Sequence, residues 1–164
     1  MSASQILIQG GQLIDPARRM DDVADLLIKG EKVTRVGAHL KSEGAEVIPA
    51  KGKVVTPGFI DLHVHLRAPG QEHKETVFTG SRAALRGGFT TLCTMANTEP
   101  VVDSAAVVEY LRGQNAKVGL VNILPYAAVT LGLTGEALTE MGELEAAGVA
   151  GFSDDGMPIL NAGV

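Results

Sequence analysis

Residues 57–67 read PGFIDLHVHLR, a largely apolar run with two histidines one residue apart and then an arginine. On a β-strand, residues i and i+2 point to the same face, about 6.6 Å apart along the strand. His63 and His65 can therefore lean toward one metal ion, for which histidine is the commonest ligand. A surface pair or a hydrogen-bonded core pair is the alternative, and the apolar neighbours favour burial of both imidazoles. Arg67 lies past the strand end and suits an anionic substrate group, although a lone arginine is more often a solvated charge.

The composition predicts a soluble globular chain with a core of its own. The sequence has 164 residues, of which 45% are hydrophobic and 20% charged. A net charge of −5 disfavours a broad basic surface for nucleic acid. The sequence has no apolar run of about 18 residues, so we expect no membrane span, and it has no secretory signal pattern. Cys93, the single cysteine, reads as a small buried hydrophobe, and cytoplasm is the expected location.

The first third of the chain has the pattern of a small β-sheet. Residues 29–32 read as a hairpin turn, and short apolar runs on both sides of it predict strands. These runs cover residues 6–8, 24–28, 33–36, 46–48 and 54–55. We therefore predict a β-sandwich segment over residues 1–56, which needs another surface to pack on.

From residue 57 onward, strands alternate with helices. The apolar patterns predict strands over 59–66, 89–95, 118–124 and 149–152, and helices over 76–86, 104–112 and 136–147. This alternation is typical of βαβ units and a parallel sheet. Four strands and three helices make about half of an eightfold barrel, so we predict an α/β fold: residues 57–164 form the N-terminal half of a (β/α)₈ TIM-type barrel. An open doubly wound sheet is the alternative, but the sequence lacks a phosphate-binding glycine loop.

Polar side chains follow three of the four predicted strands. In barrels of this type, active-site groups lie at the carboxyl ends of the strands, so we expect these side chains to meet at one mouth. An aspartate at such an end can be a metal ligand or part of a turn, and an asparagine can bind an amide or carboxylate or stabilise a turn. The residues are His63, His65 and Arg67 at the end of the first strand, Asn97 after the second, and Asp154 and Asp155 after the fourth. Of the two aspartates we favour Asp155 as the ligand.

Five segments together resemble bacterial dihydroorotase of the long type, within the amidohydrolase superfamily. They are residues 57–67 continuing into 69–70, 74–76, 87–91 (GGFTT), 97–98 and 152–156 (FSDDG). The resemblance covers nearly the whole chain. It implies a (β/α)₈ barrel with a small β-sandwich built from both chain ends. It also implies reversible cyclisation of N-carbamoyl-aspartate to dihydroorotate in pyrimidine biosynthesis.

The resemblance implies a role for each of five residues. His63 and His65 correspond to zinc ligands, and Asp155 corresponds to the metal-bridging carboxylate. The cofactor that the resemblance implies is zinc, as one or two ions. Arg67 corresponds to the residue that pairs with the substrate carboxylate, and Asn97 to one that hydrogen-bonds the substrate. The sequence departs from the family at two positions beside these substrate-contact residues. Ala68, next to Arg67, stands where the family often has Glu, and Ala96, next to Asn97, stands where it often has Pro.

One absence in the sequence disfavours the hydantoinase-like and allantoinase-like branch, and another indicates that these residues are part of a longer chain. Those relatives bridge their metals with a carboxylated lysine after strand four, and no lysine follows Lys117 here. The family's other histidine ligands and its general base follow later strands, but no histidine follows His73. We therefore expect these residues to belong to a longer chain, with the general base beyond Val164.

Three functions remain open from the sequence. The first is a dihydroorotase, and the second is another cyclic-amide hydrolase such as an allantoinase-like enzyme. The third is a metal-free, dihydroorotase-like scaffold subunit of aspartate transcarbamoylase, which the intact histidine pair disfavours. The expected partners are a small-molecule substrate and either a second copy of the chain or aspartate transcarbamoylase.

Overall fold

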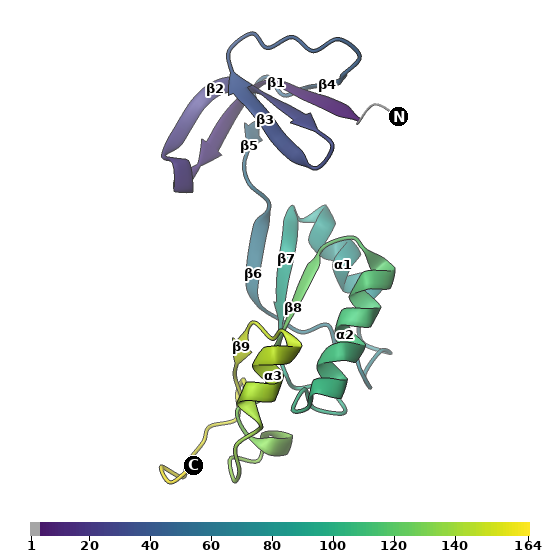
Figure 1. Cartoon of the computed structure of the whole chain (residues 1–164), viewed down its shortest axis with the longest axis vertical. Helices are drawn as coiled ribbons and strands as arrows, with labels where there is room; N and C mark the ends of the chain where they lie inside the picture. The colour runs from purple at the N-terminus through teal and green to yellow at the C-terminus, as the bar shows by residue number, and fades with distance from the viewer. Residues whose placement is uncertain (1–3) are drawn as a thin grey trace. The chain divides into compact units, whose positions relative to one another are not determined.

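The computed structural model describes residues 4–164, which divide into two compact units between Pro57 and Gly58. The described part of the first unit forms one sheet in the order β3-β2-β1-β4, with β5 also pairing with β1 (Figure 1). Its strands are β1 (Gln5–Asp15), β2 (Met20–Lys29), β3 (Lys32–Gly37), β4 (Glu46–Pro49) and β5 (Val54–Val55). All five predicted strand regions and the turn at 29–32 are confirmed. The assignment of this sheet to a β-sandwich stays a prediction.

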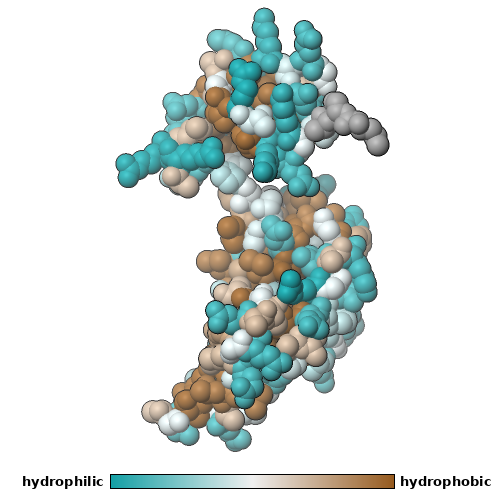
Figure 2. Space-filling model, in the orientation of Figure 1, coloured by the Kyte–Doolittle hydropathy of each residue, from teal (hydrophilic) through white to brown (hydrophobic). Residues whose placement is uncertain are grey.

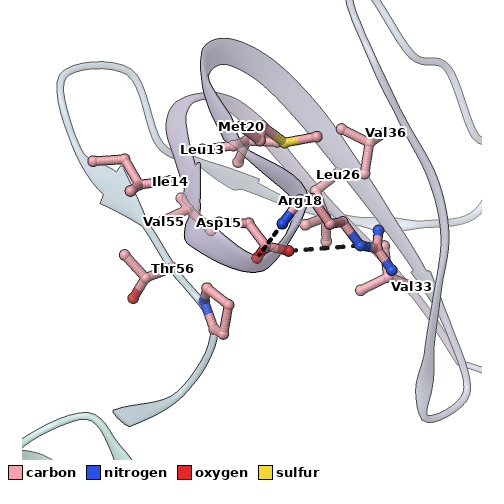
Figure 3. Close-up of a pocket in the computed structure, with 11 residues that line it drawn as sticks. Leu13, Ile14, Asp15, Arg18, Met20, Leu26, Val33, Val36, Val55 and Thr56 are labelled. Atoms are coloured by element: carbon pink, nitrogen blue, oxygen red, sulfur yellow. Dashed lines mark hydrogen bonds and ion pairs between the residues drawn. The ribbon is translucent and has the colours of Figure 1, made fainter.

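A pocket on the first unit is lined mainly by apolar side chains of β1, β2, β3 and β5 (Figure 3). Asp15 is the acidic residue of this lining, and its Oδ1 accepts hydrogen bonds from the backbone N–H groups of Ala17 and Arg18. Its Oδ2 lies 3.6 Å from Nε of Arg18. The Asp15 carboxylate thus caps the 3₁₀ turn Pro16–Arg18, and we assign no catalytic role to this pocket.

The second unit is a parallel sheet whose strands alternate with helices. Its strands run in the order β6-β7-β8-β9, and each neighbouring pair is parallel. Their bounds are β6 (Phe59–Val64), β7 (Phe89–Thr94), β8 (Asn122–Ala127) and β9 (Gly151–Phe152). The helices α1 (Val77–Arg86), α2 (Ala105–Val118) and α3 (Met141–Ala147) lie between them in sequence, and α1 and α2 pack beside the sheet (Figure 1). The predicted βαβ arrangement is therefore confirmed.

Two apolar clusters in the second unit are built from strand, helix and loop residues. Full burial of a valine or leucine side chain contributes about 1.5–3 kcal/mol, so these clusters are what fix the helices in place. The first contains Leu66, Ala68, Val77, Leu92, Val121 and Ile123, and the second contains Ala96, Val102, Val108, Leu111, Ala127, Ala128 and Leu144. Because neighbouring strands of the sheet are parallel, their carboxyl ends lie at the same edge. In the described residues no helix combines the length and apolar character needed to cross a membrane.

Among the element boundaries that differ from the prediction, two differ because other backbone contacts compete. The third helix begins at Met141 and not at residue 136, since residues 137–139 pair with residues 129–131 through backbone hydrogen bonds. The third strand begins at Asn122 and not at 118, because α2 continues to Val118. That helix ends at Gly119, whose φ of 61° is the left-handed conformation that glycine adopts at helix ends.

The apolar residues of α1 divide between two faces. Val77 packs in the core, whereas Phe78 and Leu85 are about half exposed, at 49% and 50%. The guanidinium of Arg82 lies 5.5 Å from the centre of the Phe78 ring. The buried face of α1 consists of Val77, Gly80 and Ser81. A Cβ atom at position 80 would clash with Cδ2 of Leu66, so glycine permits the close approach of the helix to Leu66.

We expect Thr76→Ala to lower the free energy of unfolding by about 1 kcal/mol, because Thr76 caps α1. Its Oγ1 accepts a hydrogen bond from the backbone N–H of Thr79, and its own N–H donates to Oγ1 of Thr79, both at 3.0 Å. Denaturant unfolding of the intact protein measures the change. Ser104→Ala is the matched control, since Ser104 has the same position at α2 without a side-chain cap bond. Equal losses for both variants would contradict the prediction.

Candidate metal centre

The side chains of His63, His65 and Asp155 converge at the carboxyl end of the parallel sheet. His63 is the penultimate residue of β6, His65 follows that strand, and Asp155 lies three residues beyond β9. One potential ligand atom from each residue lies within 4.8 Å of the others. Topology therefore joins residues about ninety positions apart, because all these strands run in the same direction.

The geometry of this group fits a zinc ion. Nε2 of His63 lies 2.9 Å from Oδ1 of Asp155, and the ring centroids of His63 and His65 are 5.3 Å apart. Ligand atoms about 2.0–2.2 Å from one zinc ion lie at most about 4.4 Å from each other, so small side-chain rotations suffice to bind it. Imidazole nitrogens with a carboxylate oxygen are also a donor set that suits zinc.

The neighbouring carboxylates of Asp154 and Asp155 have different surroundings. Asp154 is buried, and its carboxylate accepts hydrogen bonds from the backbone N–H groups of Val129 and Thr130 and from the Thr130 hydroxyl. Its oxygens are thus committed to the loop after β8. Asp155 faces His63 and has a φ of 54°, a left-handed conformation that aspartate adopts more readily than most residues. The arrangement favours Asp155 as the ligand, as we predicted, and its metal-binding role stays a prediction.

Asn97 lies between two of the candidate ligands. Its Oδ1 is 2.9 Å from Nδ1 of His65, and its Nδ2 donates a 2.8 Å hydrogen bond to Oδ2 of Asp155. Because Nδ1 of His65 is engaged by Asn97, the Nε2 atom is the one left for a metal. Sequence reasoning placed Asn97 near the site but did not predict that it would contact both ligands.

Arg67 lies three residues beyond the end of β6 and two residues after His65. Its φ of 57° is unusual for a long side chain, and conformations of this kind are concentrated at functional sites. Its carbonyl oxygen accepts a 2.9 Å hydrogen bond from the N–H of Gln71, while its guanidinium makes no hydrogen bond within residues 4–164. The cationic group is therefore available to an anionic ligand.

Neither histidine of the pair is fully buried, so that expectation was wrong. The His63 side chain is 57% exposed, and His65 is partly buried. The reason is that β6 is an edge strand of the four-stranded sheet within the described residues. Apolar side chains of the same strand are exposed for the same reason: Phe59, Ile60 and Leu62. The space-filling view shows apolar side chains gathered on the surface of the second unit where β6 lies in Figure 1 (Figure 2).

Cys93 and Asp61 lie on the two strands that lead to the site, β7 and β6. Cys93 is buried, as predicted, and burial together with the negative charge of Asp61 raises the pKa of its thiol, so the thiol is protonated at neutral pH. The sequence reasoning missed Asp61, whose Oδ1 accepts a 3.0 Å hydrogen bond from the backbone N–H of His63. Its position two residues before His63, on the same strand face, was a signal that could have revealed it.

Comparison with known proteins identifies the family. Residues 52–164 match the Dihydro-orotase-like family. The dihydroorotase of Pelotomaculum thermopropionicum is 49% identical over 160 residues, which cover 98% of this chain and 37% of that protein. The chain belongs to the dihydro-orotase-like family. Another member, the dihydroorotase of Solibacter usitatus, is 50% identical over 159 residues, covering 97% of this chain. This chain therefore spans about 37% of the length of the curated relatives it matches.

Solved structures related to this dihydro-orotase-like chain share its fold. L-hydantoinase from Arthrobacter aurescens matches with a TM-score of 0.76 and 25% identity, covering 93% of this chain and 32% of that one. D-hydantoinase from Thermus sp. matches with a TM-score of 0.60 and 36% identity, over 76% of this chain and 28% of that one. A dihydroorotase with a TM-score of 0.62 is 17% identical and supports the fold alone. These neighbours are TIM-barrel amidohydrolases, so the predicted fold class, a part of such a barrel, is confirmed.

Proposed function

We propose that this chain is part of a zinc-dependent dihydroorotase, which interconverts N-carbamoyl-aspartate and dihydroorotate. The observation that carries the proposal is the meeting of His63, His65 and Asp155 at one edge of the sheet, in a chain of the dihydro-orotase-like family. The name of the curated relatives, dihydroorotase, supports the choice of substrate. Cytoplasm is the proposed location.

In this proposal, Nε2 of His63, Nε2 of His65 and a carboxylate oxygen of Asp155 hold one or two zinc ions. Zinc in such a site lowers the pKa of a bound water toward about 7 and polarises a carbonyl oxygen. The carboxylate also offsets part of the positive charge of the metal. Asp61 holds the backbone N–H of His63, at the point of β6 from which the imidazole projects.

Arg67 and Asn97 orient the substrate in this proposal. The planar guanidinium of Arg67 pairs with the carboxylate of dihydroorotate through two parallel hydrogen bonds. Asn97 keeps one N–H and one oxygen lone pair beyond its contacts to His65 and Asp155, and these are available to the ring amide. Holding the ring in this way supplies the orientation that hydrolysis needs. We assign no general base among these residues, because each already has a role toward metal or substrate.

Another cyclic-amide hydrolase is the second candidate, and the likeness to L-hydantoinase favours it. Allantoin, hydantoins and dihydrouracil all lack a carboxylate on the ring at the position that Arg67 would bind in dihydroorotate. The absence of lysine after Lys117 weighs against the hydantoinase-like and allantoinase-like branch. A metal-free scaffold role is less well supported, because the potential ligand atoms lie together.

The test measures the zinc content of the full-length protein and compares its rates of hydrolysis of several cyclic amides. We expect bound zinc and hydrolysis of dihydroorotate, with dihydrouracil slower by a factor on the order of 10⁴, because it leaves Arg67 without its partner. Allantoin and a 5-substituted hydantoin serve as the other substrates. Faster hydrolysis of any of these three would replace dihydroorotase by the second candidate, and a protein without zinc would favour the scaffold. Size-exclusion chromatography with and without aspartate transcarbamoylase tests the proposed association with that enzyme or with a second copy.

A further inference from the structure

Asn97 is the one side chain that contacts two of the three candidate ligands within the described residues. It comes from the loop after β7, between the strand that carries His63 and the loop that carries Asp155. Its amide oxygen faces Nδ1 of His65 at 2.9 Å, and its amide nitrogen donates to Asp155 at 2.8 Å. Binding a substrate does not by itself require Asn97 to contact both His65 and Asp155.

The contact to His65 has a defined chemical consequence. The amide oxygen of Asn97 can only accept a hydrogen bond, so Nδ1 of His65 must carry the proton. The neutral imidazole then has its lone pair on Nε2, the nitrogen that remains for a metal. Partners of this kind fix both the tautomer and the ring orientation of a ligating histidine.

The contact to Asp155 acts on the second ligand in the same way. The N–H of Asn97 holds Oδ2 of Asp155, while Oδ1 lies 2.9 Å from Nε2 of His63. Asn97 thus holds Oδ2 of Asp155, and Oδ1 is the oxygen that faces the proposed metal site.

We propose that Asn97 is a positioning residue that orients His65 and Asp155 for metal binding, in addition to any contact with substrate. The inference rests on the proposed metal centre and goes further, because it assigns to Asn97 an effect on zinc affinity in the absence of substrate. Asn97 thereby connects the loop after β7 with His65, which follows β6, and with Asp155, which follows β9.

The experiment measures the zinc dissociation constant of the intact protein by competition with a chromophoric chelator, without substrate. We expect Asn97→Ala to weaken zinc binding about 10–100-fold, the usual effect of removing a partner of a metal ligand. Asn97→Leu keeps nearly the same side-chain shape without either hydrogen bond and should weaken zinc binding similarly. Asn122→Ala is the matched control, since Asn122 also makes a side-chain hydrogen bond, to Thr91, at the opposite end of the strands.

The outcomes separate the two proposals. Unchanged zinc affinity in both Asn97 variants, with only KM for dihydroorotate raised, would leave Asn97 as a substrate contact and overturn the positioning role. An equal loss in Asn122→Ala would also overturn it, because the effect would then be a general one. Failure of the unaltered protein to bind zinc would instead refute the metal centre itself. Thermal unfolding of each variant shows whether any loss of zinc comes from misfolding.

Discussion

Asp155→Ala is expected to weaken zinc binding by more than about 100-fold and to abolish hydrolysis of dihydroorotate in the intact protein. The variant removes a proposed ligand, and the loss should exceed the 10–100-fold typical of residues that only support ligands. It also removes the acceptor that faces Nε2 of His63 at 2.9 Å. Chelator competition gives the affinity, and a spectrophotometric assay of dihydroorotate gives the rate.

Two further variants separate the ligand role of Asp155 from its backbone conformation. Asp155→Asn keeps a side chain that tolerates the positive φ of this position but removes the charge, so it should fold normally and still bind zinc poorly. Asp22→Ala removes an exposed carboxylate of β2 and should leave zinc binding unchanged. Normal zinc affinity in Asp155→Ala would refute the assignment of Asp155 as a ligand.

Asp154→Ala is expected to lower the free energy of unfolding by about 3 kcal/mol or more. The substitution leaves the N–H groups of Val129 and Thr130 and the buried Thr130 hydroxyl without their acceptor. Each unsatisfied buried group costs about 1–3 kcal/mol. Denaturant unfolding measures the total, and hydrogen exchange at the amides of Val129 and Thr130 should show the local opening.

The control for Asp154 uses the same surface variant, Asp22→Ala, which should stay within about 0.5 kcal/mol of the unaltered protein. Asp154→Asn retains one acceptor oxygen and should lie between the two. If Asp154→Ala were as stable as Asp22→Ala, the hydrogen bonds to the loop after β8 would not support the fold. Such a result would also weaken the distinction between the two neighbouring aspartates.

Element types were predictable in this chain, whereas several boundaries were not. The periods of apolar residues predicted the sheet of the first unit and the alternation of strands and helices in the second. Sequence periodicity did not reveal that residues 137–139 pair with 129–131, which delays α3 to Met141. It also could not show that Phe78 faces outward, because burial depends on which helix face meets the sheet.

Residue order alone identified His63, His65, Arg67 and Asn97 as candidates, because short-range spacing and the position after a strand are visible in one dimension. It favoured Asp155 over the adjacent Asp154 as the ligand, but it offered no contact that separated the two. Only the tertiary structure distinguished them. The groups that donate hydrogen bonds to the Asp154 carboxylate belong to Val129 and Thr130, in a loop more than twenty residues away in sequence. The bridge from Asn97 to Asp155 likewise spans 58 positions and forms because parallel strands end at one edge.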